Sequence, residues 1–249
     1  MSAFTCFQRR LVRLAVAGSL VACGWASAVA CSSSSEAGVE ATLMLSSVGE
    51  PPMRDGVRSF YTDRGYQVQL SAGFLVLEHL ELQPCVDGTA LARMWAPAVA
   101  FAHTGGNPRR LAAPVLVDLT QRTREFELGS IKPPAGRYCA FQQSLGPSDA
   151  DTPGVSPDRV GQSLRLELLV SGGTLDESRE VSLVSDSVFD GFYPLEPMLL
   201  DDAHRHVTLQ IAHTGVTWFD GIDFATADDE RVLQKFLRNF RDSVEVSWR

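Results

Sequence analysis

Short segments of alternating apolar and polar residues, separated by turns rich in glycine and proline, are the feature that most constrains the fold of this chain of 249 residues. The clearest of them, residues 163–170, places Leu164, Leu166 and Leu168 on one face, and a period of two is typical of a β-strand with one buried side. The same pattern predicts further strands at residues 40–46, 95–104, 115–119, 137–141, 179–187, 204–213 and 244–248. The chain is therefore predicted to be mainly β.

Residues 60–82 form the longest apolar stretch of this kind. At a period of two, one face of the stretch carries Tyr66, Val68, Leu70, Ala72, Phe74 and Val76. Gly65 and Gly73 are positions where the backbone can bend or bulge. Two interpretations stay open, namely one long bent strand or a hairpin that turns near residues 71–73.

The C-terminal segment changes to a helical period. One face of the predicted helix carries Val232, Leu233, Phe236, Leu237 and Phe240. Thr226, with Asp229 three residues later, resembles a capping box and predicts where this helix begins. Many short strands and one late helix predict an immunoglobulin-like β-sandwich with one C-terminal helix, as a single domain over residues 41–249.

Residues 1–30 have the pattern of an export signal. Arg9, Arg10 and Arg13 form a basic start, and residues 14–30 are apolar or small. This arrangement is typical of a signal peptide rather than of a membrane span. The protein is therefore expected outside the cytoplasm.

Two cysteines near the end of this leader are candidates for lipidation. Residues 20–23 (LVAC) resemble a bacterial lipobox, whose cysteine is acylated and becomes the first residue. Cys31 follows a poorer match but precedes four serines in a predicted flexible tether, residues 31–40. The expected lipid attachment site is Cys31 or Cys23, with Cys31 favoured because it leaves an even pair of cysteines. The alternative is secretion after Ala30 without a lipid.

Cys85 and Cys139 are that even pair. In an oxidising compartment two thiols normally form a disulfide, and neither cysteine has the close spacing of a thiolate metal site. A Cys85–Cys139 disulfide is therefore predicted.

The mature chain is acidic. Its net charge falls from −8 to about −11 once the three leader arginines are removed, and a surface of that sign disfavours nucleic acid as a partner.

Three of the five histidines lie within residues 201–218. If one strand begins near His204, then His204 and His206 project from the same face. A strand His-x-His can place two imidazoles on one copper or zinc ion, and Asp201 or Asp202 would add an oxygen ligand. The alternative is a solvated polar face opposite an apolar one.

A four-residue motif, Ala-His-Thr-Gly, occurs twice in the chain and contains His103 and His213. Each histidine ends a core-facing stripe, so the two imidazoles are predicted to converge at one end of the sandwich if their strands are neighbours. His79, in line with Leu75 and Leu77, is a third candidate ligand. The alternative is a histidine at a strand end that bonds a loop carbonyl.

No catalytic residue is predicted, because the chain lacks a nucleophile elbow, a metalloprotease motif, a phosphate loop and a dinucleotide fingerprint. Its carboxylate pairs, such as Asp186 and Asp190 or Asp220 and Asp223, lack the spacing of a calcium loop. They are predicted to be turn and surface residues.

A Gly-Tyr-x-Val strand (residues 65–68), a following leucine-rich strand with a histidine, and a Pro-x-Gly-x-Tyr turn (residues 134–138) stand behind the export leader. This combination resembles the MbnP-type periplasmic proteins over residues 42 to about 170. That family is associated with copper and with copper-chelating peptides, so the resemblance implies copper binding. The lipobox and the Cys85/Cys139 pair depart from it, and no ligand position of the family is matched here.

The chain also resembles lipoproteins of soil-dwelling Gram-negative bacteria. The first functional hypothesis is therefore a lipid-anchored envelope protein, in the periplasm or at the outer membrane, that binds copper through histidines and has no other cofactor. The second is a structural or interaction module of the envelope without a metal. The expected partners are the membrane, through the lipid, and an envelope protein, a glycan or a metal chelate.

Overall fold

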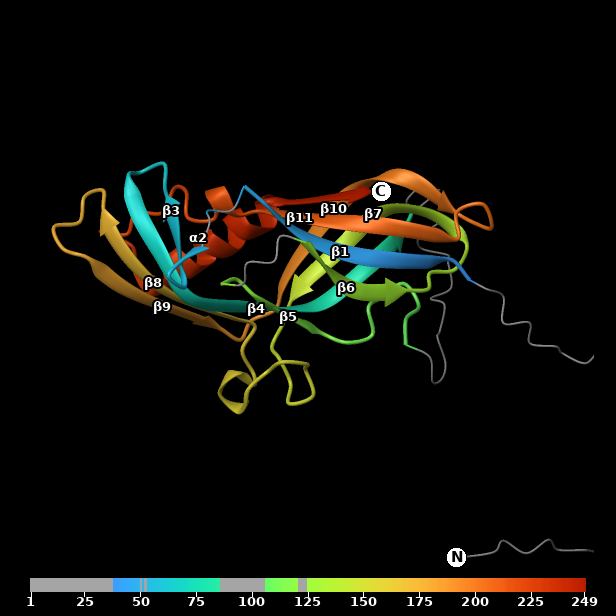
Figure 1. Ribbon diagram of the computed structural model, residues 1–249, viewed down its shortest axis with the longest axis horizontal. Helices are drawn as coiled ribbons and strands as arrows, with labels where there is room; N and C mark the ends of the chain where they lie inside the picture. The colour runs from blue at the N-terminus through green and yellow to red at the C-terminus, as the bar shows by residue number, and fades with distance from the viewer. Residues whose placement is uncertain (1–37, 50, 52, 86–105, 121–124) are drawn as a thin grey trace, which may run out of the picture. The chain divides into compact units, whose positions relative to one another are not determined.

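The computed structural model describes residues 38–49, 51, 53–85, 106–120 and 125–249, all within one compact unit that spans Ala37–Arg249. In this part of the chain the strands form two sheets, and the one α-helix lies near the C-terminus (Figure 1). The prediction of a β-sandwich with one C-terminal helix is confirmed. The leader, residues 31–37 of the predicted tether, Cys23, Cys31, the predicted strand at residues 95–104 and His103 lie outside the described residues. The tether prediction extends too far at its end, because Val39 is buried and Glu40 begins a strand.

The smaller sheet has four strands. In spatial order they are β12 (Val244–Trp248), β11 (His206–Thr214), β1 (Glu40–Val48) and β6 (Glu125–Ile131). Strand β1 runs parallel to β11 and antiparallel to β6, and β11 runs antiparallel to β12. The parallel pairing sets Leu43 beside Leu209 and Leu45 beside Ile211, and all four side chains are buried.

The larger sheet has eight strands. Its main path is β10 (Phe189–Leu200), β7 (Gly136–Leu145), β4 (Tyr66–Pro84), β3 (Val57–Tyr61) and β2 (Met53–Arg54). The strands beside this path are β5 (Val115–Asp118) and β8 (Leu164–Gly172), which both pair with β4, and β9 (Arg179–Ser185), which pairs with β8. Among the described elements strand β4 is the longest, and it pairs with β3, β5, β7 and β8 at the centre of the sheet.

Strand β4 is one continuous strand of 19 residues, so the bent-strand interpretation is confirmed and the hairpin interpretation is wrong. A β-bulge between Leu70 and Ala72 shifts its register against β8. Because one extra residue exchanges the two faces of a strand, Phe74 and Val76 do not share the face of Tyr66. The prediction of a single stripe over residues 66–76 therefore holds only as far as Leu70.

A second bulge, at Glu78, changes the prediction for His79. Leu77 lies opposite Leu145 on β7, whereas His79 lies opposite Ser144. Adjacent residues of β7 point to opposite faces, so His79 points away from the face of Leu77. The prediction that His79 is in line with Leu77 is wrong, because a period-two count cannot include an inserted residue.

Strand β10 was not predicted. It contains Pro194 and Pro197, and it lies at the edge of the larger sheet, where it pairs with β7 alone. A proline lacks the N–H that a central strand must donate, but an edge strand has a free side that tolerates it. The register of β10 shifts between Pro194 and Met198, which is where the prolines interrupt the pairing.

The helix α2 (Asp229–Asp242) buries all five predicted apolar residues. Its N-cap is Asp228, whose carboxylate accepts a hydrogen bond from the Arg231 N–H. The predicted capping box at Thr226 is therefore wrong by two residues, because Asp228 competes for the same role.

Two groups of side chains join these layers. The rings of Trp218 and Phe219 pack between Phe60 of β3 and Phe236 of α2. The second group joins β7 of the larger sheet to β11 of the smaller one, where the Gln143 side chain lies 3.4 Å from His213 Nε2. Figure 1 shows α2 beside the β3–β8–β9 half of the large sheet.

The Cys85–Cys139 disulfide is confirmed. It joins the residue after β4 to the middle of β7, with the Cα atoms 4.8 Å apart, and it closes a loop with a sequence separation of 54 residues.

Candidate functional site

His204 and His206 do not share a strand face. His204 lies in the turn before β11, where the Asp201 carboxylate accepts hydrogen bonds from the Ala203 and His204 N–H groups. The His204 Nδ1 atom lies 3.1 Å from Asp201 Oδ1, and this contact lowers the pKa of Asp201. The strand therefore begins at His206, two residues later than predicted.

His206 opens β11 beside Glu40 of β1. Its Nδ1 atom lies 3.8 Å from Glu40 Oε2, and 82% of the imidazole is exposed. Each of the two exposed histidines thus has its own carboxylate neighbour.

His213 is a core residue, as its place after Leu209 and Ile211 predicted. It is 2% exposed, and its Nε2 atom lies 3.4 Å from the Gln143 side chain. Its ring makes a T-shaped contact with the ring of Phe240, with the two centroids 4.8 Å apart. Burial lowers the pKa of His213 to about 3, so the imidazole is neutral at physiological pH.

The predicted metal ligands that lie within the described residues, His79, His204, His206 and His213, do not form one cluster. No group of three or more His, Cys, Asp or Glu side chains within the described residues is arranged to hold a metal ion. Convergence of His103 with His213 stays a prediction, since His103 lies outside those residues.

The structure instead brings together polar side chains on the outer face of β4, β7 and β10. We name this surface the polar face. It has three rows across the strands, which are His79–Ser144–Asp190, Glu81–Gln142–Phe192 and Gln83–Ala140–Pro194. The second bulge of β4 creates it, because the bulge places His79, Glu81 and Gln83 on the outer face and leaves Leu80 and Leu82 in the core.

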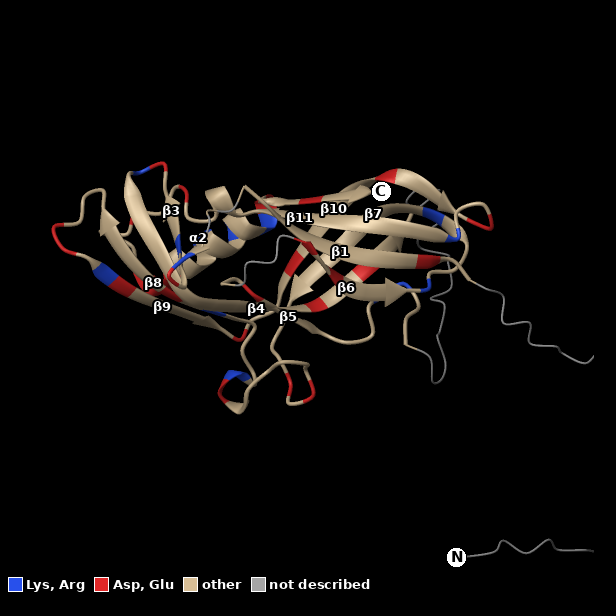
Figure 2. Ribbon diagram, viewed as in Figure 1, with Lys and Arg blue, Asp and Glu red and all other residues tan. Residues whose placement is uncertain are grey.

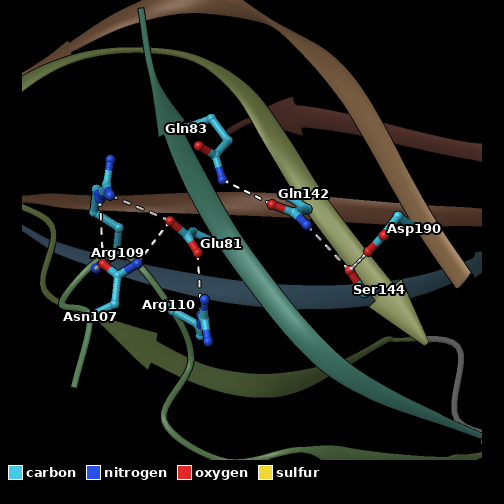
Figure 3. Close-up of polar contacts among 8 residues, drawn as sticks. All are labelled: Glu81, Gln83, Asn107, Arg109, Arg110, Gln142, Ser144 and Asp190. Atoms are coloured by element: carbon cyan, nitrogen blue, oxygen red, sulfur yellow. Dashed lines mark hydrogen bonds and ion pairs between the residues drawn. The ribbon is translucent and has the colours of Figure 1, made fainter. Parts of the chain in front are cut away.

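A chain of side-chain hydrogen bonds crosses the polar face from β4 through β7 to β10, and each residue donates to the next (Figure 3). Gln83 Nε2 donates to Gln142 Oε1 at 3.1 Å, and Gln142 Nε2 donates to Ser144 Oγ at 3.5 Å. The Ser144 hydroxyl in turn donates to Asp190. These bonds hold both amides in fixed orientations.

Glu81 anchors one side of the face. It is 6% exposed, and its two carboxylate oxygens accept from Asn107 Nδ2 at 2.8 Å and from Arg110 Nε at 3.2 Å. Arg109 lies 3.5 Å from the same carboxylate. A buried carboxylate paired with two guanidinium groups is held rigidly, and Figure 3 shows this cluster beside the hydrogen-bonded amides.

The row His79–Ser144–Asp190 contains the residue types of a hydrolase triad but not its geometry. In a triad the serine hydroxyl donates to the histidine, which then donates to the carboxylate. Here Ser144 lies between the other two and donates to Asp190. The hydroxyl proton is therefore directed to the Asp190 carboxylate and away from the imidazole, so the row is not organised for nucleophilic attack.

Phe192 is the exposed aromatic residue of this surface. It extends from the edge strand between Asp190 and Pro194, and 64% of its surface is accessible. Sequence reasoning missed the polar face, because β10 was not predicted and Asp190 was expected to be a turn and surface residue, whereas it is an exposed residue of a strand. Strand β7 gave no clear signal either, because Ser144 is buried like its neighbours Gln143 and Leu145.

Charge on the described chain is mixed. Figure 2 shows acidic residues spread over both sheets, with basic residues interspersed among them. Within the described residues, no helix is both long and apolar enough to cross a membrane.

Comparisons with protein-family models, curated proteins and solved structures give no match for this chain. The functional argument therefore depends on the geometry of the surfaces described above.

Proposed function

We propose that this protein is a lipid-anchored, non-catalytic binding module of the Gram-negative cell envelope, and that its polar face binds a glycan. The observation that carries the proposal is the exposed ring of Phe192 on a sheet face whose neighbouring amides and carboxylate are held by hydrogen bonds.

A sugar ring has the chemistry to match this face. Its hydroxyl groups both donate and accept hydrogen bonds, and side-chain amides such as those of Gln83 and Gln142 offer both functions. The flat C–H side of the ring is apolar and packs on an exposed aromatic face. Because the amides are already oriented, little side-chain entropy is lost on binding.

The charge of the chain favours a neutral or cationic glycan. The mature chain carries an excess of acidic residues, and Asp190 is an exposed carboxylate of the face itself. A polyanion would be repelled by both. The export leader and the candidate lipidated cysteines support a location where envelope polysaccharides are accessible.

Replacing Phe192 by alanine is expected to weaken glycan binding at least tenfold, since the lost aromatic contact contributes about 1.4 kcal/mol or more. The measurement is a glycan-array screen followed by calorimetry with the strongest oligosaccharide. Val184→Ala is the matched control, because Val184 is another exposed apolar residue of the large sheet, on β9. Equal affinities of wild type and Phe192→Ala, or an array without a bound glycan, would contradict the proposal.

Copper binding is a second candidate function, favoured by the two exposed imidazoles that each lie near a carboxylate. Imidazole and carboxylate are suitable ligands for Cu(II). Titration of the metal-free protein with Cu(II) at neutral pH is expected to reveal one site of about micromolar affinity or tighter. The double variant His204→Ala/His206→Ala should lose at least tenfold in affinity, and an unchanged affinity in that variant would exclude this site.

A further inference from the structure

A groove beside strand β3 is independent of the polar face. Strand β3 pairs with residues 67–70 of β4, whereas the polar face uses residues 79–83 of the same strand. The groove has a volume of about 560 Å³ and is partly open to solvent. It has room for several side chains, since a cavity of about 150 Å³ accommodates benzene.

The groove follows the edge of β3 rather than one of its faces. Its wall includes Ser59 and Tyr61, which lie on the outer face of the strand, and Phe60, which is buried in the core. Successive side chains of a strand point to opposite faces. Because residues of both faces contribute, the groove runs along the backbone between them.

The backbone of β3 directs hydrogen-bonding groups towards this groove. At the end of the β3–β4 ladder the Thr62 N–H donates to the Tyr66 carbonyl at 3.0 Å. In an antiparallel ladder every second residue bonds to the same neighbouring strand. The N–H and C=O groups of Ser59 and Tyr61 therefore point away from β4.

Strand β2 leaves this part of the edge uncovered. Its two residues pair with residues 57 and 58 of β3, and no described strand pairs with Ser59 or Tyr61 on the side away from β4. Residues 51 and 52, which precede β2, are prolines and have no N–H to donate to a β3 carbonyl. An edge of this kind is a template for an added strand.

The side chains around the edge determine which strand fits. Tyr61 is 74% exposed, and with Pro51 and Val216 it gives the groove an apolar wall. Arg54 lies opposite Val57 in the β2–β3 pair, so it shares the outer face with Tyr61. Its exposed guanidinium makes no ion pair within the described part of the chain. An apolar side chain matches the first position, and a carboxylate matches the second.

We propose that the edge of β3 binds an extended peptide, which adds a strand antiparallel to β3 and has an acidic residue near its C-terminal end. Main-chain hydrogen bonds to Ser59 and Tyr61 hold the peptide, and its alternate side chains contact Tyr61 and Arg54. In the antiparallel orientation the C-terminal end of the peptide lies towards Val57, and Arg54 is the residue opposite Val57.

Fluorescence anisotropy of labelled peptides with the full-length protein tests this inference. The probe is fluorescein-VTVTE-amide, whose valines and glutamate lie on one face of a strand, and fluorescein-VTVTK-amide is its matched control. The glutamate peptide is expected to bind saturably and at least tenfold more tightly than the lysine peptide. Equal affinities, or no saturation by the glutamate peptide below about 1 mM protein, would overturn the proposal.

N-methylation of the peptide tests strand addition itself. Residues directly opposite each other in an antiparallel pair share a face, so the valines are the residues whose N–H groups face β3. A methyl group on the nitrogen of the second valine should abolish binding, whereas one on the second threonine should be tolerated. Equal effects of the two methyl groups would overturn the proposal.

Two exposed residues of the groove provide the protein variants. Tyr61→Ala should weaken binding of the glutamate peptide at least tenfold, and Phe192→Ala, which removes the exposed ring of the polar face, should leave it unchanged. Arg54→Glu should reverse the preference and bind the lysine peptide more tightly. Unchanged affinities in Tyr61→Ala and Arg54→Glu would overturn the proposal. A wild-type dimer that Tyr61→Ala dissociates, without peptide binding, would assign the groove to a second copy of this chain instead.

Discussion

Removing the Cys85–Cys139 disulfide is expected to lower the free energy of unfolding by about 4 kcal/mol. The bond closes a loop with a sequence separation of 54 residues, and opening a loop of that length returns conformational entropy of this size to the unfolded chain. It also joins the end of β4 to β7, the two strands that carry most of the polar face.

The measurement is chemical unfolding of the wild type with and without a reducing agent. The double variant Cys85→Ser/Cys139→Ser is the control, because a reducing agent should not change its unfolding midpoint. A wild-type midpoint that is the same under both conditions would show that the bond adds nothing to stability.

Acid is expected to destabilise the protein through His213. Its pKa is about 3 in the folded state, because of burial, against 6.5 in the unfolded chain. Between these two values the unfolded state binds a proton that the folded state does not. The folded state therefore loses stability as the pH falls below 6.5. The free energy of unfolding is expected to drop by about 2.5 kcal/mol between pH 7 and pH 4.5.

His213→Gln separates this contribution from other acid effects. Glutamine can still bond to Gln143 but does not titrate, so the variant should show a flatter dependence of unfolding free energy on pH. His206→Gln, which removes an exposed histidine, should retain the wild-type slope. A wild-type slope equal to that of His213→Gln would mean that burial of this imidazole does not resist protonation.

Apolar periodicity was sufficient to predict the fold class. Strands β1, β5, β8, β9 and β12 and the buried face of α2 all appear where alternation or helical spacing predicts them. Each of these elements packs one side against the core, and the spacing of its apolar residues follows that buried side. The disulfide followed from cysteine number and the predicted compartment.

The period failed where the backbone departs from a regular strand. The bulges at β4 reverse the faces of Phe74 and His79, and an inserted residue leaves no mark in a count of apolar positions. Asp201 terminates the predicted strand by accepting two backbone N–H groups, which is turn chemistry typical of aspartate. The pairing of His204 with His206 depended on continuing the strand through that turn.

The polar face was inaccessible to sequence reasoning for a related reason. Its side chains come from three strands that are distant in the sequence, and one of them, β10, contains two prolines. Only the register between β4, β7 and β10 brings Gln83, Gln142 and Asp190 to one surface. A single sequence carries no direct record of that register.

Nuclear magnetic resonance titration with the strongest-binding oligosaccharide tests glycan binding at the polar face most directly. The side-chain amide signals of Gln83 and Gln142 and the ring signals of Phe192 are expected to shift saturably, with one common affinity that matches calorimetry. Shifts confined to the turn at residues 201–206, or to the groove beside β3, with those three side chains unaffected, would contradict the account.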